Sequence, residues 1–386
     1  MHILRMVHEY PLPWHGMTPG PYELSAAQVA LGDAVTIVCG GYPHFRTYRD
    51  ARFRVLRTKG TLPYIGPFPV TMSVSALRAW WVQRRHPAAV IHAHNHMGFY
   101  LHLARRWGGR RGGPPLALHL DITAAGREAR VLATGQRLDP ITRHYEWPLH
   151  KLADRAGCQV AEAVICVSES TRADAIRYCG ADPTKTYVVP NGVNPSRFHP
   201  EGPARREDLG LSRQDRVILY VGGLHQRKNV LALVRALRYL PPACKLLAVG
   251  TGPQEYVQAL QRAARADGVA ERVILAGYVP YPDLPPYYRA ADLFVLPSSY
   301  EGFPKVLLEA LASGVPSLAS PSFAGDGEIE KHYAPLADTE PEAVAGAISA
   351  ELSRRPAVDV AAIRQRYDWA VAARRCREIY ERIGAR

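Results

Sequence analysis

The sequence has no long hydrophobic run. Although 47% of its 386 residues are hydrophobic, no apolar stretch approaches the ~20 residues that a helix needs to cross a bilayer. The opening segment, Met1–Val7, lacks the longer apolar core and the small-residue cleavage site of a signal peptide, and it predicts a strand instead. We therefore expect neither a membrane-spanning helix nor a signal peptide.

Cysteine is sparse and scattered. The six cysteines form no C-x-x-C pair and no dense framework of the kind that cross-links small secreted domains. We therefore expect free thiols in a reducing compartment, and a cytoplasmic protein. The cysteines lie at Cys39, Cys158, Cys166, Cys179, Cys244 and Cys376.

Signatures of nucleic-acid recognition are also missing, since no helix-turn-helix, zinc-finger or RNA-binding pattern occurs. The net charge of +13 and pI near 9.6 suit a nucleic acid, an anionic membrane or a phosphorylated ligand. Arginines are spread through the predicted helices, and the densest cluster, residues 105–113, contains the glycines of a helix end. We therefore expect no nucleic-acid partner, and we favour a phosphorylated ligand over peripheral membrane contact.

Strand-like and helical segments alternate along the whole chain, which predicts βαβ units and parallel sheets. The length suits two domains. A turn-rich stretch, residues 190–195, followed by Pro200 and Pro203, indicates a linker. The predicted fold is α/β, with two Rossmann-like doubly wound parallel-sheet domains facing across a cleft at the carboxyl ends of their strands. Expected strands are 2–7, 34–39, 89–93, 116–120, 163–167, 187–189, 217–221, 245–249, 272–276, 292–296 and 316–319.

The most informative stretch, residues 300–311, contains two glutamates around a helix start. Pro304 suits the first helical position and Gly314 the residue past the end, which predicts a helix over 304–313. Glu301 then precedes the helix, and Glu309 lies inside an apolar run, where a carboxylate needs a polar partner. A hydroxyl-rich ligand with a phosphate at the helix N-terminus would satisfy both. Alternatively, Glu309 pairs with Lys305, or Glu301 only interacts with the helix dipole.

A second motif, residues 217–229, runs from a strand through a glycine turn into a helix. Arg227 and Lys228 fall near the start of that helix, where the dipole disfavours cations unless an anion binds there. A pyrophosphate would be such an anion, because both side chains bind phosphate oxygens well. The alternative is a solvated basic turn.

The segment from Glu301 to Glu309 resembles the E-x7-E motif of retaining glycosyltransferases of family four, which have the GT-B fold. Tyr300 and residues 312–316 fit the same pattern. The resemblance covers nearly the whole chain and is strongest from Val164 onward. It implies transfer of a sugar from a nucleoside-diphosphate sugar, UDP- or GDP-linked, to an acceptor hydroxyl with retention of configuration, and without a bound metal or cofactor. Residues 1–195, with a returning helix 367–384, would bind the acceptor, and residues 196–366 would bind the donor.

Carried over residue by residue, the resemblance implies catalytic roles for Lys228, Arg227, Glu301 and His119. Lys228 matches the family lysine, but Gly223 stands where the family has arginine, which leaves open whether Arg227 replaces it. Glu309 would hold the ribose hydroxyls, and Glu301 would position the sugar. The expected donor-binding residues are Gly20, Gly222, Gly223, Gly252, Tyr278, Val279, Gly302, Phe303, Pro304, Lys305 and Glu309. A further loop, residues 325–328, resembles a phosphate-side loop.

Two of these assignments fall in the first half of the chain. Gly20 precedes a predicted helix over 22–31, at the place of the family's phosphate-approaching loop. His119 follows the apolar residues 116–118 and matches the histidine beside the transferring sugar, although Leu120 separates it from Asp121. A purely structural role for His119 is the alternative.

Other histidines and tryptophans in the first half allow weaker interpretations. His92, His94 and His96 alternate and could imitate a metal site, but no carboxylate or cysteine completes a set, so we expect no metal. Residues 74–86 form a basic helical pattern with Trp80 and Trp81, which we expect to pack against a strand rather than enter lipid. Two rival functions stay open: a sugar-nucleotide epimerase of the same fold, and a nucleotide-sugar-binding module without activity.

Overall fold

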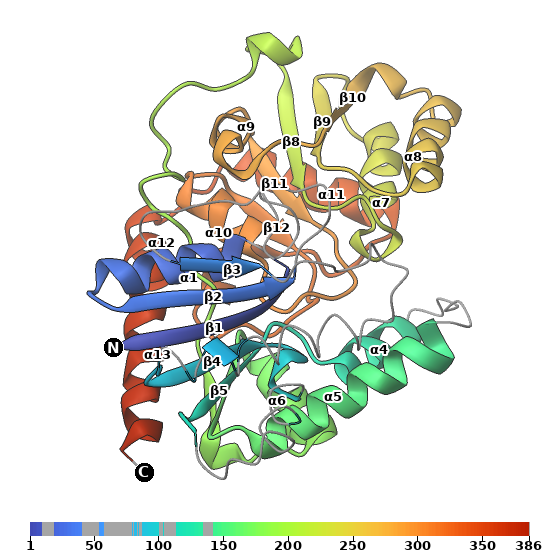
Figure 1. Cartoon of the computed structure of the whole chain (residues 1–386). Helices are drawn as coiled ribbons and strands as arrows, with labels where there is room; N and C mark the ends of the chain where they lie inside the picture. The colour runs from blue at the N-terminus through green and yellow to red at the C-terminus, as the bar shows by residue number, and fades with distance from the viewer. Residues whose placement is uncertain are drawn as a thin grey trace. The chain divides into compact units, whose positions relative to one another are not determined.

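The computed structural model describes residues 1–9, 19–40, 54–57, 79, 81–82, 84, 87–99, 103, 113–133 and 142–385 (Figure 1). The chain divides into two compact units. The first consists of Met1–Gly192 and Trp369–Arg386, and the second of Val193–Asp368. The sequence pattern placed these boundaries after residues 195 and 366. Where the chain crosses between the units, Val193 pairs with Asp368, so its two connecting segments run side by side.

The first unit contains a seven-stranded parallel sheet in the order β3-β2-β1-β4-β5-β6-β7. This order starts in the middle, goes to one edge and returns to build the other half, as doubly wound sheets do. Its described elements are β1 His2–Glu9, α1 Pro19–Ala30, β2 Ala34–Gly40, β3 Arg54–Arg57, β4 Val90–His94, β5 Leu116–Leu120, α4 Ala124–Ala133, α5 Trp147–Val160, β6 Ala163–Cys166, α6 Glu169–Cys179, β7 Thr186–Val188 and α13 Trp369–Gly384.

Both faces of this sheet are buried, because helices cover each of them. On one face, residues such as Leu4, Ile91 and Leu118 pack with side chains of α5 and α6. On the opposite face, alternate residues such as Ile3 and Ala117 pack under α1 and α13, which contact each other. The C-terminal helix is thus part of the first unit's core.

The second unit contains a six-stranded parallel sheet in the order β10-β9-β8-β11-β12-β13. Helix α7 packs against α8 and α11, whereas α10 packs against α12. The elements are β8 Arg216–Val221, α7 Val230–Ala236, β9 Cys244–Val249, α8 Gln254–Ala266, β10 Val273–Gly277, α9 Pro285–Arg289, β11 Leu293–Leu296, α10 Lys305–Ala312, β12 Ser317–Ala319, β13 Ala334–Pro335, α11 Pro341–Arg354 and α12 Val360–Tyr367.

The prediction of two doubly wound parallel sheets is confirmed, and each expected strand overlaps an observed one. The edge strands β3 and β13 were missed, because both are short and neither carries a distinct apolar run. The helix expected over 22–31 begins earlier, at Pro19. The helix expected over 304–313 is α10, with Pro304 as its N-cap and Gly314 beyond its end at φ +76°.

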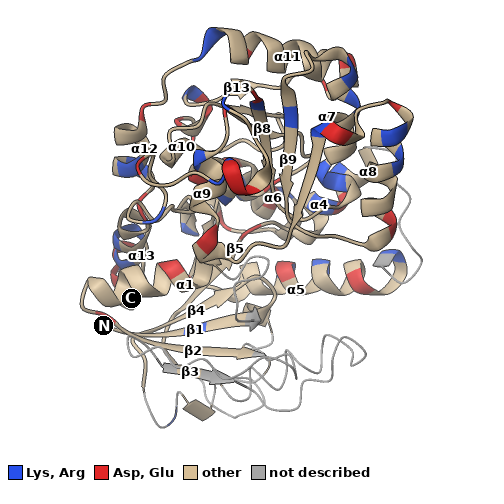
Figure 2. Ribbon diagram, turned by 90° about the horizontal axis from the view of Figure 1, so that it is seen from above, with Lys and Arg blue, Asp and Glu red and all other residues tan. Residues whose placement is uncertain are grey.

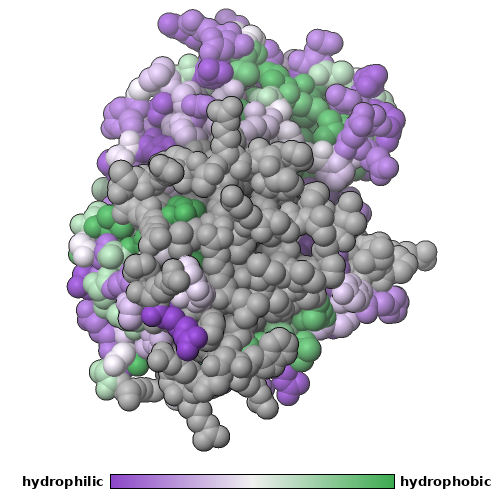
Figure 3. Space-filling view, in the orientation of Figure 1, coloured by the Kyte–Doolittle hydropathy of each residue, from purple (hydrophilic) through white to green (hydrophobic). Residues whose placement is uncertain are grey.

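The distribution of charged and apolar residues on the surface is relevant to the predictions about nucleic-acid and membrane partners. Lys and Arg are spread over several helices, among them α8, α11 and α13, with Asp and Glu between them (Figure 2). The described surface in Figure 3 mixes hydrophilic and apolar areas. Among the described residues, no helix is both long and apolar enough to cross a membrane. All six cysteines are free and buried.

The predicted helix over 74–86 lies mostly outside the described residues, Trp80 included. Within it, Ala79 and Val82 are buried, whereas Trp81 is 48% exposed. The expectation that the tryptophans pack against a strand rather than enter lipid stays a prediction, since about half of the Trp81 side chain is exposed and Trp80 is not described.

Candidate functional site

The two motifs of the second unit meet at one point of its sheet. β8 and β11 are neighbours, and the sheet's order reverses between them. In doubly wound sheets, this switch point, at the carboxyl ends of the strands, is where ligands bind. Lys228 follows β8 and Glu301 follows β11, and the Lys228 ammonium donates a hydrogen bond to Oε1 of Glu301. Both side chains are nearly buried, at 11% and 10% exposure.

Arg227 belongs to the same cluster. Its Nη1 lies 3.8 Å from Oε2 of Glu301, and its guanidinium stacks 5.1 Å over the ring of Tyr300. Its backbone carbonyl accepts a hydrogen bond of 2.8 Å from the amide of Ser299. The loops after β8 and β11 are therefore tied together by backbone and side-chain contacts. Arg227 and Lys228 lie in a single 3₁₀ turn, Gln226–Lys228, rather than inside α7.

This cluster places opposite charges close together, and the side chains of Lys228 and Glu301 are nearly excluded from water. Burial opposes ionisation of Glu301, but Lys228 and Arg227 outweigh it and lower the pKa of that carboxyl. Burial also lowers the pKa of Lys228, which Glu301 partly offsets. The cluster contains two cations and one carboxylate, so its net charge is positive and favours a second anionic group. An anionic group bound here would restore the balance.

Glu309 lies on the buried face of α10. It is 4% exposed, and its Oε2 accepts a 2.7 Å hydrogen bond from the hydroxyl of Tyr288 on α9. Burial, and then the carboxylate itself, raise the pKa of Tyr288 well above its usual value, so Tyr288 remains a hydrogen-bond donor. The sequence predicted that this carboxylate needs a polar partner, and Tyr288 is one.

Three glycines near the site, at positions 222, 250 and 252, are required by the geometry of the backbone itself. Gly222 and Gly250 adopt φ of +148° and +141°, a region that favours glycine. A Cβ on Gly250 would lie 1.9 Å from the carbonyl oxygen of Gly222, and one on Gly252 would lie 1.8 Å from that of Leu224. The loops after β8 and β9 thus pack backbone against backbone, and glycine is required whether or not a ligand binds.

Gly223, where the resemblance expects an arginine, differs from these three. A Cβ there would lie 2.8 Å from Cδ2 of His225, an exposed side chain. A larger residue at this position would need His225 to move, so the two positions are coupled. Burial, Arg227 and Lys228 lower the pKa of His225, so it adds little positive charge near neutral pH. Arg227 is accordingly the arginine that the structure places beside Lys228.

The remaining donor-binding candidates lie at the carboxyl ends of other strands of the same sheet or at the start of α10. Tyr278 and Val279 follow β10, and Tyr278 is 37% exposed. Phe303 and the N-cap Pro304 are buried, and the Phe303 ring packs 5.8 Å from Phe323. Gly302 and Lys305, on either side, are half-buried.

The loop 325–328 is held by α12. The carboxylate of Asp326 accepts hydrogen bonds from the Tyr367 hydroxyl at 2.8 Å and from Arg366 at 2.9 and 3.0 Å. Burial opposes its ionisation, but the hydrogen bonds from Tyr367, the Ile329 amide and Arg366 lower the pKa of Asp326 below its usual value. These contacts give Asp326 an anchoring role.

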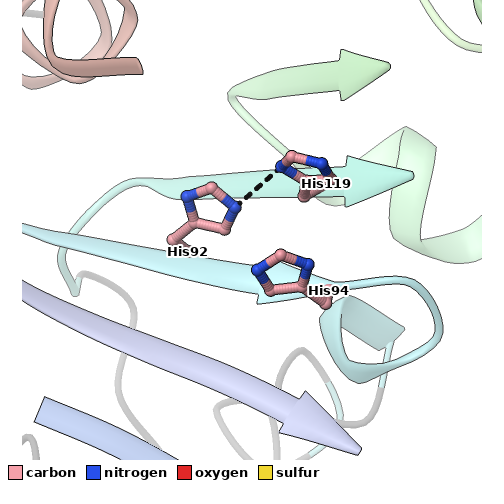
Figure 4. Close-up of side chains that lie close together, drawn as sticks. All are labelled: His92, His94 and His119. Carbon is pink, nitrogen blue, oxygen red and sulfur yellow. Dashed lines mark hydrogen bonds between the residues drawn. The ribbon is translucent and has the colours of Figure 1, made fainter. Parts of the chain in front are cut away.

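In the first unit, three buried histidines gather near the carboxyl ends of β4 and β5. His94 and His119 are register partners, and His92 lies on the same face of β4 (Figure 4). His92 Nε2 and His119 Nδ1 are 3.1 Å apart, and ligand atoms of the three rings all lie within 4.8 Å of one another. His119 is part of β5 and does not end it, since the strand continues to Leu120.

The sequence indicated that His92, His94 and His96 point the same way, and for His96 this is wrong. His96 contacts Asp154, with Nδ1 2.8 Å from Oδ1, and stacks on His150. Its place beside His92 and His94 is taken by His119. A turn at Asn95, with φ +50°, ends β4 and directs His96 away from the cluster.

Gly20 lies inside the first turn of α1 and is buried, instead of lying in a loop ahead of the helix. The proline pair Pro19 and Pro21 explains this, because proline suits the first helical turn. Sequence reasoning also missed the buried polar residues that lead to the histidines: Tyr380 contacts His92, Gln28 contacts Tyr380, and Arg5 contacts Gln28. A signal was present for Arg5, a charged residue within an apolar strand.

Comparison with known proteins adds to this geometry. Residues 15–197 match the family described as Glycosyltransferase Family 4, and residues 215–354 match Glycosyl transferases group 1. A D-inositol 3-phosphate glycosyltransferase from Xylanimonas cellulosilytica is 32% identical over 240 residues, 57% of this chain and 57% of that relative. A UDP-Gal:alpha-D-GlcNAc-diphosphoundecaprenol alpha-1,3-galactosyltransferase from Escherichia coli is 34% identical over 166 residues, 41% of this chain and 42% of the relative. These alignments span about half the length of each relative.

Solved structures resemble the whole chain. Sucrose-phosphate synthase from Thermosynechococcus elongatus has a TM-score of 0.82 at 21% identity, covering 100% of this chain and 99% of that one. Anabaena HepE in complex with UDP-glucose has a TM-score of 0.70 at 20% identity, covering 100% of both chains. At these identities the likeness shows a common fold.

Proposed function

Because this chain belongs to the glycosyltransferases of family 4, we propose that it transfers a sugar from a nucleoside-diphosphate sugar to an acceptor hydroxyl. The observation that carries the proposal is the cluster of Lys228, Arg227 and Glu301 at the switch point of the second unit. Two cations held there by one carboxylate form a site for a diphosphate. Anabaena HepE was solved with UDP-glucose, and the name of the Escherichia coli relative includes UDP-Gal, so a UDP-linked sugar is the first donor to test.

The cations and the carboxylates of the site would have different roles in the reaction. Lys228 and Arg227 would stabilise the negative charge that grows on the diphosphate as the sugar–phosphate bond breaks, which is usually the largest catalytic contribution. Their placement in one 3₁₀ turn that is hydrogen-bonded to the loop after β11 would limit the reorganisation needed during the reaction. Glu301, which orients Lys228, would also contact the sugar hydroxyls. Tyr288 would hold Glu309 so that this carboxylate can accept hydrogen bonds from the ribose.

The proposal extends to stereochemistry, metal use and acceptor site. We propose that the configuration at the anomeric carbon is retained, with a donor phosphate oxygen taking the acceptor's proton, as the family resemblance implies. We further propose that the reaction needs no divalent cation, because the cationic cluster would neutralise the leaving diphosphate. The first unit, with His119, would bind the acceptor and the reacting sugar.

A donor screen tests the proposal. UDP-, GDP-, ADP- and dTDP-sugars are added one at a time, and the thermal unfolding midpoint and the release of nucleoside diphosphate are measured. One nucleotide class should raise the midpoint, since a ligand that binds only the folded state stabilises it. Slow hydrolysis of that donor without acceptor, and product of unchanged anomeric configuration with acceptor, would support a retaining transferase. Activity should persist in excess EDTA.

Two other outcomes would replace the proposal. Interconversion of the sugar nucleotide without acceptor would identify an epimerase, and binding without turnover would identify a binding module. Lys228→Met should abolish both donor stabilisation and hydrolysis. The matched control is Lys245→Met. Lys245 forms an ion pair of 3.0 Å with Asp215 and lies at the amino end of β9, whereas the proposed site lies at the carboxyl ends of the strands of the same sheet. Equal effects of the two variants would refute the assigned site.

A further inference from the structure

A continuous chain of hydrogen bonds crosses the largely apolar face of the first unit's sheet, under α1 and α13. Arg5 on β1 donates to Oε1 of Gln28 on α1. The Gln28 amide nitrogen lies 3.2 Å from the hydroxyl of Tyr380 on α13, and that hydroxyl contacts Nδ1 of His92. His92 Nε2 lies 3.1 Å from Nδ1 of His119. We call these five side chains the relay.

The relay is deeply buried, so each of its contacts matters energetically. Arg5, Gln28 and His92 are 0% exposed, Tyr380 is 2% and His119 is 5%. Apolar residues surround them on the same face, among them Ile3, Val90 and Ala117. A polar group buried in such surroundings without a hydrogen bond costs about 1–3 kcal/mol, so the proton positions along the relay are strongly selected.

The chemistry of the first residue sets the direction of the chain. An arginine guanidinium has only donors, so the atom of Gln28 that faces it must be the carbonyl oxygen. The amide nitrogen of Gln28 therefore faces Tyr380 and donates to the phenolic oxygen. Having accepted this bond, the Tyr380 hydroxyl can direct its own proton to His92 Nδ1.

The next link follows from the charge state of His92. Burial, and then the charges of Arg5, His94 and His119, lower the pKa of His92 well below its usual value, so this ring is neutral. A neutral imidazole that accepts at Nδ1 carries its proton on Nε2. That proton points at His119 Nδ1, which therefore accepts.

We propose that the relay holds His119 in the tautomer that carries its proton on Nε2, and that Arg5, Gln28, Tyr380 and His92 are positioning residues for this group. His119 then presents an N–H donor from Nε2, suited to a hydroxyl or ring oxygen of a sugar. The catalytic consequence rests on the proposed function, whereas the tautomer is a property of the protein alone. The C-terminal helix thereby sets the proton position of a side chain in β5.

One competing arrangement exists within the relay. Cys376 lies one helical turn before Tyr380 and interacts with its hydroxyl. If the Tyr380 proton turned toward this thiol, the phenolic oxygen would accept from His92 Nδ1, and every later proton would reverse. His119 would then carry its proton on Nδ1. Sulfur is a weak acceptor compared with an imidazole nitrogen, which favours the relay as proposed.

The experiment reads the tautomer directly. Long-range ¹H–¹⁵N correlation spectra of the full chain distinguish the two neutral forms of histidine, and the His119→Gln spectrum assigns the resonance. Tyr380→Phe removes the hydroxyl proton and keeps the ring. Gln28→Glu introduces a carboxylate that still accepts from Arg5 but can now only accept from Tyr380, so it draws the hydroxyl proton away from His92. Cys376→Ala is the control, since it alters packing on the same face of α13 without breaking the relay.

In the wild type and in Cys376→Ala, His119 should carry its proton on Nε2. In Gln28→Glu, the proton should shift to Nδ1. In Tyr380→Phe, His92 Nδ1 has neither a donor nor an acceptor, so the preference for Nε2 should be lost and both forms of His119 should appear. A wild type with the proton on Nδ1, or a tautomer that none of these variants changes, would overturn the proposal. Addition of Zn²⁺ tests the alternative use of the three histidines. Since the relay occupies His92 Nε2 with a proton, the spectra should not change, and stoichiometric loss of the three histidine signals would show a metal site instead.

Turnover provides an independent second measurement. Once a donor is known, Gln28→Glu should lower kcat by roughly tenfold to a hundredfold, the range expected for one misdirected hydrogen bond to the reacting sugar, and Tyr380→Phe should lower it less. The donor KM should change less, and Cys376→Ala should match the wild type. A tautomer shift without any change in kcat would preserve the relay but contradict the role of His119. Absence of turnover in the wild type would bear only on the proposed function.

Discussion

The strongest test of the site is to remove Lys228 in two different backgrounds. Lys228→Met keeps much of the side chain's length but deletes the cation that Glu301 contacts. A drop in activity alone would be ambiguous, because the protein would also be destabilised. The double variant Lys228→Met/Glu301→Gln removes both charges and leaves an uncharged pair of similar shape. Because Glu301 is itself assigned a contact with the sugar, the double variant is also compared with Glu301→Gln alone. Any further loss of activity in the double variant then reports the role of Lys228 in binding the diphosphate, apart from its role in the fold.

The stability change can be worked out from the contacts. Removing one partner of a buried ion pair costs about 3–5 kcal/mol, because the other charge is left without compensation. Arg227 remains 3.8 Å from Oε2 of Glu301, an attraction of about 4 kcal/mol at an effective dielectric constant of about 20 before desolvation is subtracted. The loss should therefore lie near the low end, at about 3 kcal/mol. For a unit of this size each kcal/mol lowers Tm by about 2–4 °C, so Tm should fall by roughly 6–12 °C.

The double variant should recover most of this loss, to within about 1 kcal/mol of the wild type, because neither charge is left alone. Activity should not recover. Loss of a pre-organised cation at the diphosphate should lower the rate by about 100-fold or more in both variants. The assays are differential scanning calorimetry, and nucleoside-diphosphate release with the donor identified by the screen, at a temperature where all variants are folded.

The reasoning is refuted if the double variant regains activity together with stability. That outcome would show that Lys228 acts only by supporting the fold. It would equally be refuted by a single variant as stable as the wild type, since the Lys228–Glu301 contact would then have no energetic weight.

Three further predictions concern the second unit. Tyr288→Phe should lower the free energy of unfolding by about 1.5–3 kcal/mol, the worth of a hydrogen bond to a buried charged group, whereas Glu309→Gln should keep that bond and mainly weaken donor binding; urea unfolding and calorimetry with the donor distinguish them. Gly250→Ala should cost at least about 2 kcal/mol, because its φ of +141° and the neighbouring carbonyl leave no room for Cβ, and Gly210→Ala, with φ +65° in open space, should cost about 1 kcal/mol; equal losses would contradict this. Because the folded-state pKa of Asp326 is lowered, its contribution to stability is present above its usual pKa of 3.8 and is lost as pH falls below it. The stability gap between wild type and Asp326→Asn should therefore close in acid, and a gap that stays constant down to pH 2 would argue against it.

Local patterns determined much of the fold. Strand positions followed from short apolar runs, and the end of α10 from Gly314, because φ/ψ preferences and burial of one face act over a few neighbouring residues. The same local logic found Lys228, Glu301 and Glu309 as charged groups in places where charge is costly. It erred where several residues compete for one position, as at the start of α1, where Pro19 and Pro21 set the helix boundary earlier than the apolar pattern indicated.

Other features depended on tertiary structure alone. Lys228 and Glu301 are 73 positions apart and meet because β8 and β11, adjacent in the sheet, end at the same edge. Gln28 and Tyr380 are 352 positions apart and meet because α1 and α13 cover one face of one sheet. Such pairings are set by strand order and helix packing, which depend on the burial of the whole chain and leave no periodic trace in the residues themselves. The sequence could therefore identify charged and polar side chains that need partners, but only the tertiary structure decided which partners they have.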